Sequence, residues 1–375
     1  MAGASMPVYR PSHGGNLVWA ASLAHCSPAA ILDFSASINP LGPPPSAIAA
    51  IQAALGEVNA YPDPTYSQLC HAISNFHHIP PEWILPGNGS AELLTWACRE
   101  LADLDKTYLL TPAFSDYQRA LKAFGAVVEE CPLDEFRVPS AECRVPSAVS
   151  PLDWLRHSPF AIRSGLLLNN PHNPTGQLLT REAIAPYLDQ FALVVVDEAF
   201  MDFLPPGEDH SVIDWVQQYP NLVVLRSLTK FYSLPGLRLG YAIAHPERIQ
   251  RWQQWRDPWS VNSLAAAVGS VVLQDTAFQQ QTWDWLATMR PKFEHQLARI
   301  PGLQPLTSAA NFFLVQSDRS VPELQATLLK HDQILIRDCM SFPELGDRYF
   351  RVAVRTAEEN QRLIDALSQR IGNRE

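Results

Sequence analysis

Short apolar runs alternate with amphipathic stretches over residues 83–244. Three of these runs contain no charged or amide side chain and lie at residues 165–168, 193–196 and 222–225. An uninterrupted apolar run is typical of a strand that helices cover on both faces of a parallel sheet, because a strand with one solvated face alternates instead. The pattern therefore predicts an α/β fold that contains a mostly parallel sheet.

The pattern changes after Ala265, where longer helical stretches replace the rapid alternation. The predicted helices cover residues 268–299 and 322–331, and the predicted short strands lie at residues 312–315, 334–336 and 350–354. We interpret this part of the chain as a second, smaller α/β domain. The predicted organisation is an N-terminal arm with part of the small domain (1–45), a large domain (46–262) and a small C-terminal domain (263–375).

Polar residues follow each of the three apolar runs. The first run leads into Asn-Asn-Pro-His-Asn-Pro-Thr-Gly at residues 169–176, the second into Asp197 and Glu198, and the third into residues 226–230. Ligands of open α/β sheets bind beyond the carboxyl ends of the strands. We therefore expect the functional residues of this chain to lie in these segments.

The composition excludes several classes of function. The formal charge of the chain is −10 and its Lys and Arg residues form no block, which argues against binding to nucleic acid or to an anionic membrane. No segment reaches the roughly 18 apolar residues of a membrane span, and residues 1–16 have neither a basic start nor an apolar run. These features predict a cytoplasmic protein. The six cysteines contain no Cys-x-x-Cys pair, which argues against a zinc site or a disulfide framework.

The strongest chemical signal is Lys230, in Ser227-Leu228-Thr229-Lys230 directly after a buried strand. Burial at a strand end lowers the pKa of a lysine and leaves a neutral amine that can attack an aldehyde. The hydroxyl of Ser227 and the guanidinium of Arg238 can bind a phosphate dianion. The alternative interpretation of Lys230 alone is a surface lysine that follows a strand.

Asp197 changes the interpretation of Lys230. A carboxylate at a buried strand end costs free energy unless a cation pairs with it. A protonated pyridine nitrogen is such a partner, and Asn173 can donate a hydrogen bond to a phenolic oxygen on the same ring. An aldehyde, a phosphate, a pyridine nitrogen and a phenolic oxygen together indicate pyridoxal 5′-phosphate as the cofactor, with Asp197 keeping its ring protonated as an electron sink.

Two further segments fit this cofactor. Gly87-Asn88-Gly89-Ser90-Ala91 precedes a helical stretch at residues 93–101, so the free backbone N–H groups near Ser90 and Ala91 suit a phosphate. The alternative is an ordinary helix cap. Phe114 follows another predicted strand and can stack on the ring, or it can pack in the core.

The order of Lys230, Arg238, Asn-Pro-Thr-Gly at residues 173–176 and Asp197 resembles the fold-type-I pyridoxal-phosphate enzymes, the aspartate aminotransferase superfamily. The resemblance covers nearly the whole chain. It implies a large domain with a mostly parallel seven-stranded sheet flanked by helices, a smaller α/β domain, and Lys230 as the residue that holds the cofactor as a Schiff base. It also implies that Tyr61 reaches the cofactor phosphate of the neighbouring subunit in a homodimer.

Within the superfamily, the chain is similar to the histidinol-phosphate aminotransferases and more closely to the threonine-phosphate decarboxylases of cobalamin biosynthesis. The segments that carry this similarity are residues 13–16, 33–42, 226–241 and 258–262. Phe200 stands where the related aminotransferases place a tyrosine that binds the phenolic oxygen, and this difference favours the decarboxylases. Ser37 stands where the relatives usually carry asparagine, in an arm that touches the substrate.

Two arginines suit a substrate that carries both a carboxylate and a phosphate. Arg351 matches the carboxylate-binding arginine of the superfamily, and Arg337 lies on a neighbouring predicted strand. Guanidinium groups bind either anion through paired hydrogen bonds. Our hypothesis is that Arg351 turns the carboxylate out of the ring plane while the substrate phosphate is held by Arg337, His13, Gly14 and Asn173. The alternatives are surface ion pairs for the arginines and a solvated side chain for His13.

These features predict a pyridoxal-phosphate-dependent carboxy-lyase that converts L-threonine O-3-phosphate to (R)-1-amino-2-propanol O-2-phosphate. The first alternative is an aminotransferase of the histidinol-phosphate type, which shares the cofactor residues. The second is a binding or regulatory protein that keeps the fold without the chemistry. The joint presence of Lys230, Asp197, Asn173 and Arg238 argues against the second alternative.

Overall fold

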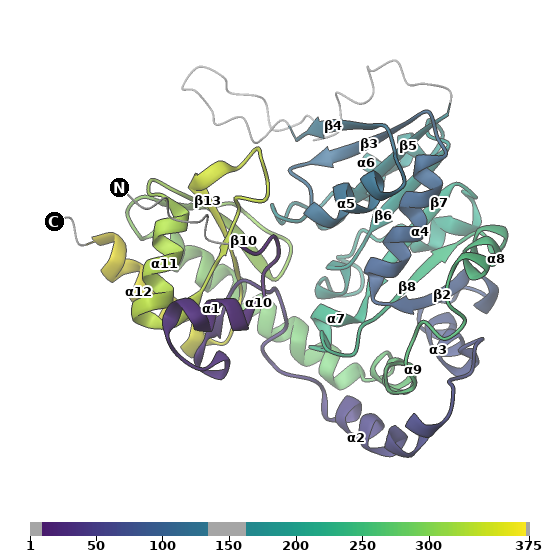
Figure 1. Cartoon of the computed structure of the whole chain (residues 1–375), viewed down its shortest axis with the longest axis horizontal. Helices are drawn as coiled ribbons and strands as arrows, with labels where there is room; N and C mark the ends of the chain where they lie inside the picture. The colour runs from purple at the N-terminus through teal and green to yellow at the C-terminus, as the bar shows by residue number, and fades with distance from the viewer. Residues whose placement is uncertain (1–9, 134–162, 373–375) are drawn as a thin grey trace, which may run out of the picture.

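The structure, a computed structural model, describes residues 10–133 and 163–372. Its central element is a seven-stranded sheet (Figure 1). The strand order is β2 (Ile84–Asn88), β8 (Leu239–Ala244), β7 (Leu222–Ser227), β6 (Leu193–Asp197), β5 (Ser164–Asn169), β3 (Lys106–Thr111) and β4 (Val128–Pro132). Only β8 runs antiparallel to its two neighbours. The predicted mostly parallel seven-stranded sheet is confirmed.

Both faces of the sheet are buried. Along β6, Val194 and Val196 belong to one apolar cluster and Val195 belongs to the other, because successive side chains of a strand point to opposite faces. One face is covered by α4 (Ser90–Ala102), α5 (Ser115–Ala123) and α8 (Pro246–Trp255). The other is covered by α3 (Ser67–His77), α6 (Arg181–Leu188) and α9 (Ser263–Val272). This double cover explains why the central strands carry uninterrupted apolar runs.

A second sheet is formed by the C-terminal part of the chain. Its four antiparallel strands are β12 (Arg337–Asp338), β13 (Tyr349–Ala353), β10 (Phe312–Ser317) and β9 (Leu303–Pro305). In Figure 1 this sheet lies on the left, beside α11 (Val321–Asp332) and α12 (Ala357–Gly372). The long helix α10 (Thr276–Ala298) contacts both parts, since Trp283 donates a hydrogen bond to the carbonyl oxygen of Asp202 and Phe293 packs against Phe313.

The N-terminal arm joins this second part. Strand β1 (Leu32–Asp33) pairs in parallel with β11 (Ile334–Leu335), and α1 (Leu17–Ala24) packs on α11 through Ala20, Ala21 and Leu329. The arm then leads to α2 (Pro45–Ala54) and the large sheet. Short 3₁₀ helices connect the elements at Pro28–Ala30, Leu55–Asn59, Pro81–Trp83, Met201–Phe203, Ile213–Gln217 and Gly346–Arg348. The exact domain boundaries stay predictions.

Three expectations about element bounds are wrong in detail. The helical stretch over residues 268–299 is divided between α9 and α10, because the side chain of Asp275 caps α10 by accepting a hydrogen bond from the Phe278 backbone N–H. The strand expected at residues 334–336 is split into β11 and β12, which belong to different sheets. Lys230 lies within α7 (Leu228–Phe231), one turn beyond the end of β7.

Among the described residues, no helix is both long and apolar enough to cross a membrane.

The doubly covered sheet makes a stability prediction. Leu167 lies at the centre of β5 and is fully buried, so Leu167→Ala should lower the free energy of unfolding by about 2–5 kcal/mol through lost burial and the cavity that remains. Urea denaturation of the two proteins measures this change. Val127→Ala is the control, because the Val127 side chain is exposed and its loss should change the value by less than about 0.5 kcal/mol. Equal changes in the two variants would contradict the assigned burial.

Candidate active site

The two sequence-predicted catalytic residues lie at the ends of adjacent strands. Asp197 is the last residue of β6, and Lys230 follows β7 by three residues. Burial lowers the pKa of Lys230 from its ordinary value, the charges of Arg238 and Arg351 lower it further, and the charge of Asp197 opposes them. The site therefore favours a neutral, nucleophilic amine beside a carboxylate.

The carboxylate of Asp197 is buried and held by two donors. Its Oδ1 accepts a hydrogen bond from the backbone N–H of Ala199 at 3.0 Å, and its Oδ2 accepts one from the hydroxyl of Tyr117 at 2.8 Å. Burial raises the pKa of Asp197, while Lys230, Tyr117 and Ala199 lower it. Within residues 10–133 and 163–372, no Lys, Arg or His nitrogen forms an ion pair with this carboxylate. A protonated ring nitrogen therefore fits the requirement of this buried charge.

Two glycines allow an arginine to reach the N-terminus of α4. A Cβ atom on Gly89, whose φ is +74°, would lie 2.6 Å from Nη2 of Arg238, and a Cβ atom on Gly240 would lie 2.5 Å from the backbone nitrogen of Ser90. Both positions therefore exclude any larger residue. The free N–H groups of the first turn of α4, around Ser90 and Ala91, lie beside the Arg238 guanidinium, which is a suitable environment for a phosphate. Ser227 Oγ lies 3.4 Å from Lys230 Nζ at the same end of the sheet.

One aromatic ring, that of Phe200, lies over the Lys230 amine. The centroid of the Phe200 ring lies 5.5 Å from Nζ of Lys230, and Phe200 packs edge-on against Phe312. Phe114 immediately precedes α5, and its ring centroid lies 5.3 Å from that of His13, so the N-terminal arm reaches this side chain. The described structure thus brings Lys230, Phe200 and Phe312 together, and it joins Phe114 to the N-terminal arm.

Arg351 links the arm to the segment that contains Asn173. Its Nη1 donates a hydrogen bond to Oδ1 of Asn173, and its Nη2 donates one to the carbonyl oxygen of Ser35 at 2.9 Å. Burial lowers the pKa of Arg351 to about 10. Because Arg351 binds Oδ1, the amide N–H groups of Asn173 remain able to donate. A hydrogen bond to a phenolic oxygen would use one of these N–H groups.

Arg337 also contacts the arm. It lies opposite Arg351 in the β12–β13 register. Its Nη2 donates hydrogen bonds to the carbonyl oxygen of Ser12 at 2.6 Å and to Oγ of Ser341 at 2.5 Å. Gly14, two residues after Ser12, packs against Ser35. A Cβ atom on Gly14 would lie 2.3 Å from the carbonyl oxygen of Ser35. The structure therefore places Arg337, His13 and Gly14 at one border of the site.

Three buried polar atoms have no hydrogen-bond partner among the residues that the structure describes: Oγ of Ser37, Oδ1 of Asn311 and Nε of Arg351. The backbone oxygen of Ser37 accepts a hydrogen bond from the Asn311 amide, which places the first two together. Buried polar groups without a partner are rare in folded proteins. A polar ligand bound between the arm and β13 would satisfy such groups, and this is the region in which the sequence places the substrate.

The structure does not bring Tyr61 to Lys230 through any recorded contact in the described chain. Its side chain is 79% exposed, and its ring stacks on that of Trp259 at a centroid distance of 4.4 Å. A side chain on the surface can act only at a site that another molecule or another subunit presents. Its predicted role in a neighbouring subunit stays a prediction.

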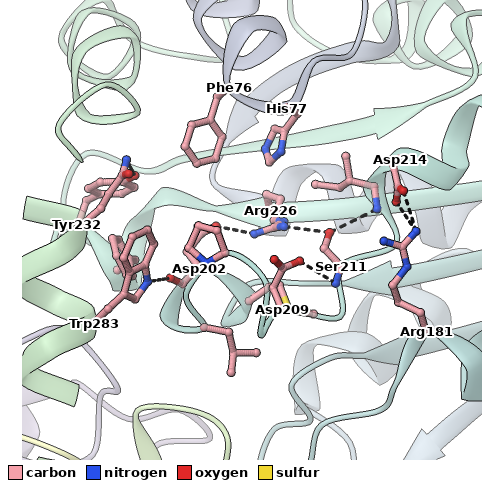
Figure 2. Close-up of a pocket in the computed structure, with 16 residues that line it drawn as sticks. Phe76, His77, Arg181, Asp202, Asp209, Ser211, Asp214, Arg226, Tyr232 and Trp283 are labelled. Atoms are coloured by element: carbon pink, nitrogen blue, oxygen red, sulfur yellow. Dashed lines mark hydrogen bonds and ion pairs between the residues drawn. The ribbon is translucent and has the colours of Figure 1, made fainter. Parts of the chain in front are cut away.

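Sequence reasoning missed the buried ion network next to Lys230. Arg226, on β7, pairs with Asp202 and with Glu198, whose Oε2 lies 3.0 Å from Nε, and its Nη2 donates to Oγ of Ser211. Figure 2 shows Arg226 between Asp202 and Ser211 at the wall of a cavity of about 310 Å³. Glu198 follows Asp197 directly and Arg226 precedes Ser227. The network therefore ties together the two strand ends that carry the predicted catalytic residues.

Tyr117 and Asn311 were also missed, because no local pattern distinguishes them. A tyrosine at the third position of a helical stretch is usually a core residue, and an isolated asparagine before a strand usually belongs to a turn. The one available signal was the spacing of Tyr117 from Phe114, which places both residues in the first turn around the start of α5.

The chain is similar to known proteins over most of its length. Residues 29–367 match the family described as aminotransferase class I and II. The chain is 38% identical over 368 residues to a threonine-phosphate decarboxylase of Salmonella typhimurium. The matched region covers 96% of this chain and 97% of that protein. It is 31% identical to an adenosylcobalamin biosynthesis bifunctional protein of Leptospira interrogans, over 96% of this chain and 41% of that protein. The solved histidinol-phosphate aminotransferase of Clostridium acetobutylicum has a TM-score of 0.82 and 28% identity, over 92% of this chain and 100% of that chain.

The charges around Lys230 predict how its amine responds to pH. In the protein without cofactor, acetylation of Lys230 should rise at a pH below the ordinary lysine value of about 10.4, because only the neutral amine reacts and burial lowers the pKa. Asp197→Asn should move this rise to a still lower pH, since the charge of Asp197 favours the protonated amine. Mass spectrometry of the labelled peptides measures both effects, with the exposed Lys122 as an internal reference. A shift to higher pH in Asp197→Asn would refute the assigned electrostatics.

Proposed function

This chain belongs to the class I and II aminotransferase family, and on that premise we propose that it is a pyridoxal-phosphate-dependent carboxy-lyase. Its substrate is L-threonine O-3-phosphate and its product is (R)-1-amino-2-propanol O-2-phosphate, the linker for the nucleotide loop of cobalamin. The observation that carries the proposal is the likeness to the Salmonella decarboxylase over almost the full length of both chains.

The cofactor side of the site supports this assignment. Pyridoxal phosphate, when bound, supplies a protonated ring that accepts the electron pair left at the substrate's α-carbon when carbon dioxide leaves. Lys230 would provide the amine for covalent attachment, and Asp197 would face the ring nitrogen. Ser90, Ala91, Ser227 and Arg238 would hold the cofactor phosphate, and Phe114 would stack on the ring.

Phe200 supports a decarboxylase over an aminotransferase. Its ring lies 5.5 Å from the Lys230 amine and has no group that can donate a hydrogen bond to the phenolic oxygen. Asn173 is then the side chain that donates to this oxygen, while Arg351 holds the other end of the same amide. The chain thus keeps the cofactor contacts of the family and lacks the tyrosine that the related aminotransferases use.

The substrate side consists of two guanidinium groups on adjacent strands. Arg351 binds the carboxylate and holds the bond to it perpendicular to the ring, because the bond that breaks is the one aligned with the π-system. Arg337, with His13, Gly14 and Asn173, binds the phosphate at the border between β12 and the arm. The unpaired hydroxyl of Ser37 adds a donor between the two anions. Two guanidinium groups at opposite positions of adjacent strands favour a substrate with two acidic groups over one with a single carboxylate.

We further propose that the protein acts as a homodimer whose subunits share each site. Exposed apolar side chains gather around α2, the following 3₁₀ helix and α9, which lie side by side in Figure 1. They include Ile48, Leu55, Val58, Tyr61, Trp259 and Val271. An exposed apolar surface of this kind is typical of a subunit interface. Tyr61 would reach the cofactor phosphate of the partner from this surface. A cytoplasmic location also stays a prediction.

The second candidate is a histidinol-phosphate aminotransferase. The likeness to the Clostridium acetobutylicum structure favours it, because the two chains share a fold along almost their whole length. The two activities share Lys230, Asp197, Asn173 and Arg238 and differ in the fate of the α-carbon, so the products distinguish them directly.

A direct assay tests the proposed reaction. The purified protein, incubated with pyridoxal phosphate and L-threonine O-3-phosphate, should release carbon dioxide and the amino-alcohol phosphate in equal amounts. Lys230→Ala should lower kcat by at least about a thousandfold, because the variant has no amine at this position. Lys292→Ala, at an exposed position on α10, is the matched control and should keep the wild-type rate. Transfer of the amino group from glutamate to imidazole-acetol phosphate, without carbon dioxide release, would establish the aminotransferase instead.

Mixed dimers test the shared site. Tyr61→Ala and Lys230→Ala should each be nearly inactive at limiting cofactor. If Tyr61 acts across the interface, co-expressed subunits should recover about a quarter of the wild-type activity, because half of the random dimers contain one intact site of two. Activity that stays at the level of the separate variants would show that Tyr61 and Lys230 act within one subunit.

A further inference from the structure

A buried tyrosine hydroxyl lies against the carboxylate that faces the ring nitrogen. Tyr117 is 2% exposed, and its Oη lies 2.8 Å from Oδ2 of Asp197. We propose that Tyr117 is a positioning residue that makes Asp197 a weaker base than the ring nitrogen, so that the ring keeps its proton. This inference rests on the proposed function in one respect only, the binding of pyridoxal phosphate with its nitrogen toward Asp197.

The direction of the hydrogen bond is fixed by the chemistry of both partners. Burial raises the pKa of Tyr117 well above its ordinary value, and the charge of Asp197 adds to this effect, so the hydroxyl stays protonated. A protonated phenol has a single proton to donate, and the structure directs it to Oδ2. The backbone N–H of Ala199 occupies the other oxygen. The carboxylate is therefore held at both oxygens, which fixes its plane.

The position of Tyr117 is itself fixed by packing. The residue lies in the first turn of α5, and its ring meets the ring of Phe114 edge-on at a centroid distance of 5.6 Å. Its ring also belongs to the apolar cluster that α4 and α5 form against the sheet, together with Cys98. Asp116 and Cys98 are the other titratable groups on this side. Both raise the pKa of the phenol and so favour its protonated form. The hydroxyl donates its hydrogen bond to Asp197.

Tyr117 differs from Lys230 in how long its influence lasts. Both lower the pKa of Asp197, but Lys230 is the amine that attaches the cofactor and is released during turnover. Tyr117 takes no part in covalent chemistry. It is therefore the side-chain donor that acts on Asp197 at every stage of the reaction.

Removal of the hydroxyl should move the ring proton toward Asp197. A hydrogen bond to a charged group is strong enough to shift an equilibrium by a factor of about ten or more, which equals about one pKa unit. In Tyr117→Phe, Asp197 should therefore become about tenfold more basic and compete with the ring nitrogen for the proton. Because the ring then withdraws electrons less strongly, kcat should fall by about tenfold while KM stays near the wild-type value.

The test uses the holoenzyme with pyridoxal phosphate labelled with ¹⁵N in the ring. In the wild type, the ¹⁵N resonance should lie at the position of a protonated pyridine, and in Tyr117→Phe it should move toward that of the neutral ring. Tyr241→Phe is the matched control, because Tyr241 is equally buried and its hydroxyl bonds to His77 at 2.8 Å, away from Asp197. Tyr241→Phe should leave both the resonance and kcat unchanged.

Two results would overturn the proposal: an unchanged resonance in Tyr117→Phe, or an equal displacement in Tyr241→Phe. If Tyr117→Phe does not fold, 3-fluorotyrosine at position 117 replaces it, since this residue keeps the hydroxyl and makes it a stronger donor. The resonance should then stay at the protonated position, as in the wild type, and movement toward the position of the neutral ring would also refute the proposal. The ¹⁵N measurement requires only bound cofactor, so a failure of decarboxylation in the wild type would not be confused with a failure of this inference.

Discussion

The site depends on one electrostatic interaction, that between the carboxylate of Asp197 and the amine of Lys230 at the buried ends of two adjacent strands. Each group alone would cost free energy there, since burial raises the pKa of the first and lowers that of the second. The carboxylate charge is available to a ring nitrogen, while burial and the charges of Arg238 and Arg351 favour the neutral amine against the opposing charge of Asp197. The ion network of Arg226, Glu198 and Asp202 links the two strand ends, because removal of Arg226 would leave two buried carboxylates without their cation.

The substrate side is assembled from segments that lie far apart in the sequence. Arg351 contacts Ser35 of the arm and Asn173 of the large sheet at the same time, so a single guanidinium joins the three parts. Any displacement of the arm therefore alters the hydrogen bonding of Arg351. In the proposed function, this one side chain would couple recognition of the substrate to the position of Asn173.

Much of the fold and the cofactor side could be predicted from the sequence, because their signals are local. Apolar runs without polar positions revealed β5, β6 and β7, and the polar residues that follow them include Asn173, Asp197 and Lys230. The division between α9 and α10 was not predicted, since a single capping aspartate outweighed a continuous helical pattern. Tyr117, Asn311 and Arg226 act through partners that are distant in the sequence, and no periodicity encodes such a pairing. The proposed role of Tyr61 involves a second subunit, and the contacts of the single chain do not test it.

The parallel pairing of β1 with β11 joins residues 32–33 to residues 334–335. On the ribosome, the arm emerges first and has no strand to pair with until nearly all of the chain has been synthesised. The large sheet, whose strands end at Ala244, can be complete long before that point. The nascent protein would thus acquire a cofactor cradle before it acquires a substrate pocket, and the last step of folding would also be the step that makes the enzyme selective.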